Sequence, residues 1–250
     1  MDEALIYKRK MAKEQINSAL LGEVRECKIF LPPGYDEKSR YPVIYCQDGD
    51  DFFSMGRIAT HATRLILEER IEPVIIVGIS VDKKVRTAEY SPYGARFVAY
   101  TRFFAEELVP YIESRYAVDA VANRRILAGD SLGGTVSLHI ALDAPHLFRR
   151  IISLSGAFLP KTQGKIAAFH DLSHLHMYML IGADETAVKT ETGVYDFLGY
   201  NRLTHKLLVE RGAEVAYREK AGGHTWGLWQ SELPEGLLLF LHRTNGRSAL

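Results

Sequence analysis

The sequence predicts an α/β fold in which a mostly parallel central sheet is flanked by helices. Short apolar runs of strand length recur along the chain, and stretches with helical character separate them. Strands that alternate with helices in this way typically build a parallel sheet. The 250 residues are enough for one such domain with a large core. We therefore expect residues 1–250 to form a single α/β domain.

The expected elements follow one another in a regular order. The strand-like runs are residues 74–79, 125–128, 151–154, 177–181 and 215–219. Apolar residues recur at helical spacing from Phe97 to Ile112, which indicates a helix with one buried face, and residues 237–241 belong to a terminal helix. The stretch between residues 154 and 177 is too short for a separate lid domain, so we expect a site that is open or only partly covered.

A strand, a sharp turn and a helix are predicted around the sequence Gly129-Asp130-Ser131-Leu132-Gly133-Gly134. Small residues at the ends of a G-x-S-x-G motif let the chain bend tightly, which lifts the serine hydroxyl out of the sheet and aims the helix N-terminus at it. The strand before the motif and the helix after it are the context that the motif demands. Ser131 is therefore the predicted nucleophile.

A carboxylate and a histidine follow Ser131 in the order that such a nucleophile needs. The run at 177–181 leads into Gly182-Ala183-Asp184-Glu185, which indicates a buried strand that delivers a carboxylate at its end. His224 lies in a glycine-containing loop after the run at 215–219. A serine hydroxyl is a poor nucleophile until a base takes its proton. We expect His224 to be that base and the carboxylate to fix its tautomer.

Several further segments resemble one known family. Residues 29–35 (IFLPPGY) and 41–45 (YPVIY) are similar to its first strands, residues 104–113 resemble its helix before the serine, and residues 222–224 (GGH) resemble its histidine loop. The chain resembles, over nearly its whole length, the esterase D and enterochelin-esterase-like branch of the α/β-hydrolases. This resemblance implies a single α/β-hydrolase domain that hydrolyses a carboxylic ester or a thioester without a metal or an organic cofactor.

The resemblance also bears on the acid and on the oxyanion hole. Enzymes of this kind usually place the acid three residues after the glycine that ends the strand, which favours Glu185. Aspartate is the commoner residue type, so Asp184 stays open as the alternative. Two backbone N–H groups must face the oxyanion: Leu132, next after the nucleophile, would supply one, and the family match implies Asp50 for the other. The Asp50 carboxylate must then point away from the oxyanion.

Candidate substrate-binding residues follow the run at 74–79. Arg86, Glu89 and Tyr90 lie where open α/β sheets bind ligands, beyond the carboxyl end of a parallel strand, and family members carry an arginine and a Glu-Tyr pair at the matching place. A structural Arg–Glu pair that holds the loop is the alternative. Trp226, beside the histidine loop, is a candidate apolar wall, with ordinary core packing as its alternative.

Composition excludes several classes of protein. The 31 Lys and Arg balance the 31 Asp and Glu, and no basic stripe is present, so nucleic acid is not an expected partner. Residues 1–22 lack the apolar core of a secretory signal, and no run approaches the length of a membrane span, which predicts a cytoplasmic protein. Cys27 and Cys46 fall in predicted strands and are expected to be buried thiols. No metal site is expected.

The predicted function is therefore hydrolysis of a small-molecule ester by a serine esterase, through a Ser-acid-His triad and an acyl-enzyme. A siderophore lactone is one candidate substrate, and acetyl, feruloyl and glutathione esters are others. Two alternatives stay open: an acyltransferase that uses the same triad, and a binding protein that keeps the fold without the chemistry. The sequence fixes neither the acyl and alcohol parts of the substrate nor the oligomeric state.

Overall fold

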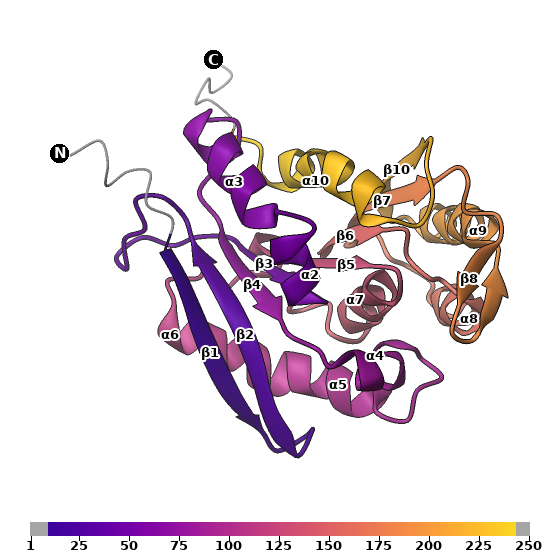
Figure 1. The fold of residues 1–250 in the computed structure, drawn as a ribbon, viewed down its shortest axis with the longest axis horizontal. Coiled ribbons are helices and arrows are strands. Elements are labelled where there is room, and N and C mark those ends of the chain that lie inside the picture. Colours follow the sequence, from indigo (N-terminus) through magenta and orange to yellow (C-terminus); the bar gives the residue numbers. More distant parts are fainter. Residues whose placement is uncertain (1–9, 244–250) are drawn as a thin grey trace.

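The computed structural model describes residues 10–243, and one mixed sheet runs through this part of the chain (Figure 1). Its eight strands lie in the order β1-β2-β4-β3-β5-β6-β7-β10. β1 pairs antiparallel with β2, and β2 pairs antiparallel with β4. Every later pair of neighbours is parallel, which confirms the mostly parallel sheet. The strands are β1 (Lys10–Ser18), β2 (Glu23–Leu31), β3 (Val43–Cys46), β4 (Ile75–Ile79), β5 (Arg125–Asp130), β6 (Arg150–Leu154), β7 (His176–Gly182) and β10 (Glu214–Lys220).

Helices cover both faces of this sheet (Figure 1). One face packs against α2 (Gly49–Ser54), α3 (Ile58–Leu67) and α10 (Trp226–Leu241). The other face packs against α5 (Phe97–Phe103), the π-helical turn η1 (Phe104–Leu108), α6 (Val109–Arg115), α7 (Leu132–Asp143), α8 (Pro160–Ala167) and α9 (Phe197–Glu210). Two short helices complete the list, α4 (Lys83–Tyr90) after β4 and the 3₁₀ turn η2 (Ala122–Arg124) before β5.

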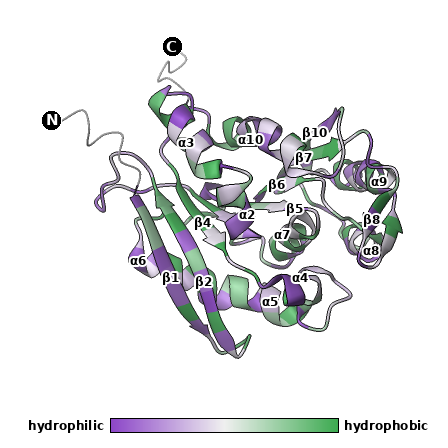
Figure 2. Ribbon diagram, in the orientation of Figure 1, coloured by the Kyte–Doolittle hydropathy of each residue, from purple (hydrophilic) through white to green (hydrophobic). Residues whose placement is uncertain are grey.

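The central strands are buried on both sides, which explains their continuous apolar sequences. Along β3, Val43 and Tyr45 pack into the core beneath α5–α7, whereas Ile44 and Cys46 pack into the core beneath α3 and α10. β1 and β2 are different, because hydrophilic residues are frequent along them (Figure 2). Cys27 and Cys46 are both free and buried, as predicted.

The predicted helix from Phe97 to Ile112 is present, although a π-helical turn divides it. Its predicted apolar face is buried in the core, and these residues are Phe97, Tyr100, Phe104, Leu108 and Ile112. No separate lid domain is present among residues 10–243, in agreement with the prediction.

Three of the strands, β1, β8 and β9, were not predicted. β1 lies in the charged and polar segment at residues 1–22 and has no local apolar pattern. It forms because nine of its residues pair antiparallel with β2. The other two form a small hairpin, β8 (Val188–Thr190) and β9 (Gly193–Tyr195). That residues 1–250 form a single α/β-hydrolase domain stays a prediction, because residues 1–9 and 244–250 lie outside the described part.

Candidate active site

The backbone of Ser131 has the strained conformation that a nucleophile elbow requires. Ser131 lies between β5 and α7 with φ 51° and ψ −121°, a region that non-glycine residues rarely adopt. The end of β6 and the loop after it hold Ser131 there, because its N–H donates to the Leu154 carbonyl at 2.9 Å and its carbonyl accepts from the Ala157 N–H at 2.9 Å. Gly129 is required at this bend, since a Cβ there would overlap the Gly133 backbone.

His224 is paired with a buried carboxylate. Its Nδ1 lies 2.7 Å from Glu185 Oε2, and the Glu185 side chain is fully buried while that of His224 is 18% exposed. Glu185 follows β7 and His224 follows β10, and these two strands are parallel neighbours, so their carboxyl ends lie side by side. A Cβ at Gly182 would overlap the Gly222 carbonyl, so the close approach of the two loops requires glycine.

The structure distinguishes the two candidate acids. Asp184 is exposed, whereas Glu185 points inward and carries the contact to His224. The other oxygen of Glu185, Oε1, accepts from the Ser155 hydroxyl at 2.6 Å and from the Gly182 N–H at 2.9 Å. A carboxylate with both oxygens bonded in this way has one fixed orientation toward the imidazole.

Two residues that the sequence did not single out support this pair. Ser155, at φ 50°, accepts from the Trp229 indole N–H at 2.8 Å while it donates to Glu185. The Trp229 ring meets the His224 imidazole at an interplanar angle of 88°, with ring centroids 4.8 Å apart. No local motif marks Ser155 or Trp229, because both are far from Glu185 in the sequence.

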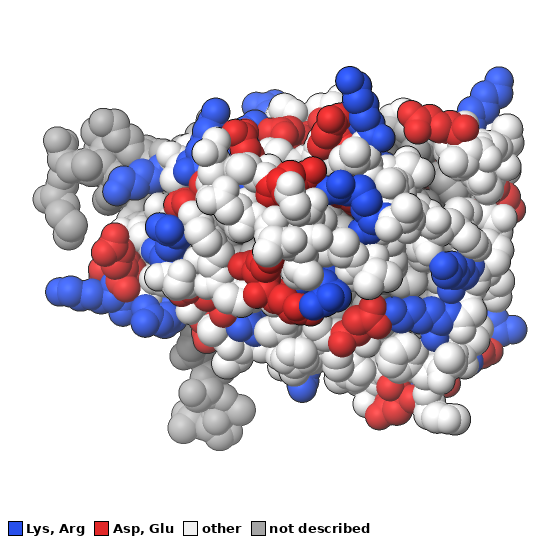
Figure 3. All heavy atoms as spheres, turned by 90° about the horizontal axis from the view of Figure 1, so that it is seen from below, with Lys and Arg blue, Asp and Glu red and all other residues white. Residues whose placement is uncertain are grey.

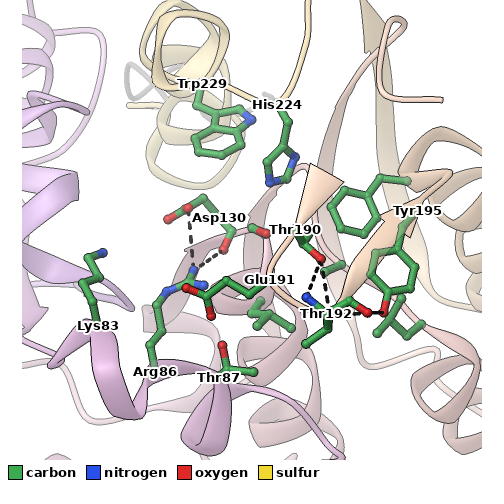
Figure 4. Close-up of a pocket in the computed structure, with 15 residues that line it drawn as sticks. Lys83, Arg86, Thr87, Asp130, Thr190, Glu191, Thr192, Tyr195, His224 and Trp229 are labelled. Carbon is green, nitrogen blue, oxygen red and sulfur yellow. Dashed lines mark hydrogen bonds and ion pairs between the residues drawn. The ribbon is translucent and has the colours of Figure 1, made fainter. Parts of the chain in front are cut away.

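Ser131 and His224 line one cavity of about 350 Å³ (Figure 4). Leu132 and Trp229 also line it, and α4 contributes Lys83, Arg86 and Thr87. The unpredicted β8–β9 hairpin provides much of the remaining wall, with Thr190, Glu191, Thr192 and Tyr195. The hairpin therefore covers part of the site, and no lid domain accompanies it among residues 10–243.

The predicted oxyanion donors lie at the N-termini of two helices. Leu132 is the first residue of α7, so its N–H has no acceptor within the helix. Asp50 is the second residue of α2, and its carboxylate forms an ion pair with Lys28 at 2.5 Å. The carboxylate is thus engaged by a lysine on β2, and the oxyanion role of the Asp50 backbone stays a prediction.

Arg86 lines the cavity and also braces the loop before α2. Its guanidinium forms a two-pronged contact with the Asp48 carboxylate, with Nε–Oδ1 and Nη2–Oδ2 distances of 2.7 Å each. Asp48 is buried and has a left-handed backbone, φ 49°. The carboxylate keeps the pKa of Arg86 above its ordinary value even though burial opposes the charge.

Glu89 and Tyr90 are not in the cavity wall, which corrects the expectation that they contact substrate. Glu89 is fully buried and binds two other arginines, Arg25 at 2.7 Å and Arg96 at 3.1 Å. Tyr90 is also fully buried, and its hydroxyl accepts the Asp48 N–H at 3.1 Å. Both residues therefore have a structural role. A structural Arg–Glu pair was the alternative interpretation of this segment, although Glu89 pairs with Arg25 and Arg96 and not with Arg86.

Trp226 does not line this cavity, and its role as an apolar wall of the site stays a prediction. Its ring packs edge-on against Phe52 and Trp229, with centroid distances of 5.1 and 5.3 Å. Trp229, three residues later on the same helix, reaches the cavity in its place. One turn of helix separates the two positions, and the sequence alone does not determine which ring faces inward.

Charge is mixed over the surface, and the face seen in Figure 3 carries both signs interspersed. Within residues 10–243, no cluster of three or more His, Cys, Asp or Glu side chains is arranged to hold a metal ion. None of the helices in that range is long and apolar enough to cross a membrane. The cytoplasmic location stays a prediction.

Comparison with known proteins gives consistent results. The family model described as "Putative esterase" matches residues 18–240. The uncharacterized protein YjcH of Bacillus subtilis is 37% identical over 212 residues, which are 84% of this chain and 88% of that protein. The iron(III) enterobactin esterase of Escherichia coli K12 is 24% identical over 230 residues, and the match covers 91% of this chain but 56% of the relative.

Solved structures share the fold. The enterobactin esterase of Shigella flexneri superposes with a TM-score of 0.78 at 22% identity, covering 92% of this chain and 59% of that one. A ferulic acid esterase gives a TM-score of 0.78 at 20% identity, covering 94% and 98% of the two chains. These likenesses confirm the α/β-hydrolase fold.

Proposed function

The chain belongs to the esterase family and is a carboxylic ester hydrolase, and from this premise we propose that it acts through a Ser131–His224–Glu185 triad. The observation that carries the proposal is the 2.7 Å contact between His224 Nδ1 and the buried Glu185 carboxylate. This pair adjoins a cavity that Ser131 also lines, from a strained turn at the N-terminus of α7.

The reaction would proceed in two halves. His224 Nε2 accepts the Ser131 hydroxyl proton as Oγ attacks the ester carbonyl, and the charge on the imidazole is stabilised by Glu185. The negative charge that develops on the carbonyl oxygen is stabilised by backbone N–H groups, for which Leu132 and Asp50 are the candidates. His224 then gives its proton to the leaving alcohol, and the acyl group stays on Ser131 until water, activated by the same histidine, releases the acid.

A lactone or ester of siderophore type is the substrate that we propose to test first. Relatives named iron(III) enterobactin esterase and iron(III) salmochelin esterase support it, although this chain spans about half the length of each of these relatives. Relatives named feruloyl or ferulic acid esterase make aromatic acyl esters the natural comparison. The partly covered cavity is compatible with esters that extend beyond it.

The decisive experiment compares the wild-type protein with Ser131→Ala on p-nitrophenyl acetate, p-nitrophenyl octanoate, methyl ferulate and a catecholate trilactone. Ser137→Ala is the matched control, because Ser137 is a buried serine on α7, the helix that begins directly after Ser131, and it does not line the cavity. We expect Ser131→Ala to lose at least about 10³-fold in kcat/KM and the control to keep its activity. A fluorophosphonate probe should label the wild type and the control but not Ser131→Ala.

The outcomes are distinct. Preference for the trilactone would support the siderophore substrate, and preference for methyl ferulate would overturn it in favour of an aromatic acyl ester. Turnover that survives the loss of the Ser131 hydroxyl would overturn the triad.

A further inference from the structure

Asp130, immediately before the proposed nucleophile, carries a buried carboxyl group that is only partly satisfied. It ends β5 and lines the same cavity as Ser131 and His224. The residue is 6% exposed, and among residues 10–243 its Oδ1 has no hydrogen-bond partner. Oδ1 is shielded from the cavity, so Oδ2, whose nearest cation is 3.9 Å away, is the oxygen that a bound molecule can reach. Buried polar atoms in folded proteins are nearly always bonded, so a poorly paired carboxyl group in the wall of a cavity points to a partner that enters the cavity.

The neighbouring cations are already committed to other carboxylates. Arg86 approaches Asp130 Oδ2 only to 3.9 Å, because its guanidinium is held by Asp48 at 2.7 Å. Lys83 binds Asp51 at 2.6 Å and Asp48 at 3.3 Å. Three carboxylates thus share two cations, and Asp130 is the least well paired of them.

Burial and the nearby Asp48 carboxylate raise the pKa of Asp130 to about 7, although Arg86 and Lys83 oppose the shift. Asp51 adds to it, and the other titratable side chains that line the cavity are Glu191, Tyr195 and His224. Asp130 therefore exchanges its proton near neutral pH. As a carboxylic acid it donates a hydrogen bond, and as a carboxylate it accepts one. A hydroxyl group is the complement that fits both forms, because it also donates and accepts.

The placement of Asp130 indicates which part of the substrate it faces. In the proposed reaction His224 protonates the leaving alcohol, so the alcohol part lies on the His224 side. Figure 4 shows Asp130 between His224 and Arg86, with its carboxyl joined to Arg86 on the α4 side of the cavity. The acyl part, held on Ser131, extends toward this α4 wall.

We propose that Asp130 is a specificity-determining residue that binds a hydroxyl group on the acyl chain, close to the scissile carbonyl. The proposal rests on the proposed function, since it deepens the substrate class of the same serine site. An acyl carboxylate is disfavoured, because it would meet Asp130 and the exposed Glu191 as well as the cations. A hydroxyl group is neutral, so it can bind Asp130 without repulsion from these carboxylates.

The test uses p-nitrophenyl esters of butanoate, 2- and 3-hydroxybutanoate, and the corresponding methoxybutanoates. A methoxy group has a similar inductive effect but no proton to donate, and each kcat/KM is divided by the rate of hydroxide-catalysed hydrolysis of the same ester. We expect the better hydroxy ester to exceed its methoxy partner by about tenfold or more, as expected for a hydrogen bond to a charged or acidic group. Equal rates, with turnover still dependent on Ser131, would overturn the inference and leave the proposed function intact.

Variants then identify the residue. Asp130→Leu should bring the hydroxy to methoxy ratio close to one, and Asp130→Asn should restore most of it, because an amide both donates and accepts. Asp51→Asn is the matched control: it removes one negative charge from the same cluster, and its side chain lies outside the cavity wall. A ratio that survives in Asp130→Leu, or that falls equally in Asp51→Asn, would overturn the direct contact. Loss of Ser131 dependence for every ester would overturn the proposed function itself.

Discussion

Replacing Glu185 by Gln should inactivate the enzyme by holding His224 in the wrong tautomer. Glu185 Oε1 accepts from two donors, the Ser155 hydroxyl and the Gly182 N–H. The amide oxygen of Gln must keep that place, because the backbone N–H cannot become an acceptor. The amide NH₂ then faces His224 Nδ1 and donates to it. The imidazole proton moves to Nε2, which can no longer accept a proton from Ser131.

The size of the effect follows from this geometry. The substitution changes neither the volume of the side chain nor its contacts, so the loss is that of the correct tautomer and of the charge that stabilises the imidazolium. A comparable change in a serine triad costs about 10⁴-fold in kcat, which corresponds to about 5.4 kcal/mol of transition-state stabilisation. The assay is kcat and KM on p-nitrophenyl butanoate at pH 7 to 8, with circular dichroism as the check on folding.

Asp184→Asn is the matched control, because it makes the same chemical change at the neighbouring, exposed position. Its activity should stay within about twofold of the wild type, as for other surface substitutions. The reasoning would be refuted if folded Glu185→Gln kept more than about a tenth of the wild-type kcat, or if Asp184→Asn lost as much.

Three other substitutions test the site and its scaffold. Ser155→Ala removes a donor to Glu185 and should lower kcat about tenfold with little change in KM; an unchanged kcat would remove Ser155 from the network. Gly129→Ala should destabilise the fold by about 3 kcal/mol or more in thermal unfolding, whereas Gly164→Ala, where a Cβ meets nothing within 4 Å, should not. Because the pKa of Asp130 rises from 3.8 to about 7 on folding, its carboxyl disfavours the native state increasingly as the pH rises from about 4 to about 7. Asp130→Asn should therefore raise the free energy of unfolding in urea at pH 8, by up to about 4 kcal/mol relative to its effect at pH 4, and an equal effect at both pH values would contradict this shift.

Local patterns were sufficient for most of the fold. The central strands are apolar on both faces and the helix from Phe97 to Ile112 has one apolar face, so burial determined both and the sequence predicted both. β1 was missed because it pairs along one edge with β2 and carries few buried residues. The β8–β9 hairpin was missed because its three-residue strands are largely exposed and have no alternating pattern.

The predicted contacts of the substrate residues needed the tertiary structure. Tyr90 and Glu89 follow Arg86 closely in the chain, and the Arg86 guanidinium lies over the Tyr90 ring, 5.2 Å from its centroid, but of the three only Arg86 lines the cavity. Arg86 reaches the cavity, whereas Glu89 is drawn into a buried cluster with Arg25 and Arg96. Arg86 and Tyr90 both contact Asp48, so proximity in the sequence predicted a shared structural partner but not shared access to the cavity.

The sequence by itself determined where Ser131 and His224 stand and that a carboxylate follows β7, because the elbow and the loop are encoded by residues next to one another. Only the tertiary structure decided that Glu185 meets His224, that Ser155 and Trp229 support this pair, and that Asp130 is left with a free oxygen. These contacts join residues tens of positions apart, and their geometry depends on the register of neighbouring strands. A local pattern specifies a turn, but the packed sheet specifies which side chains meet across it.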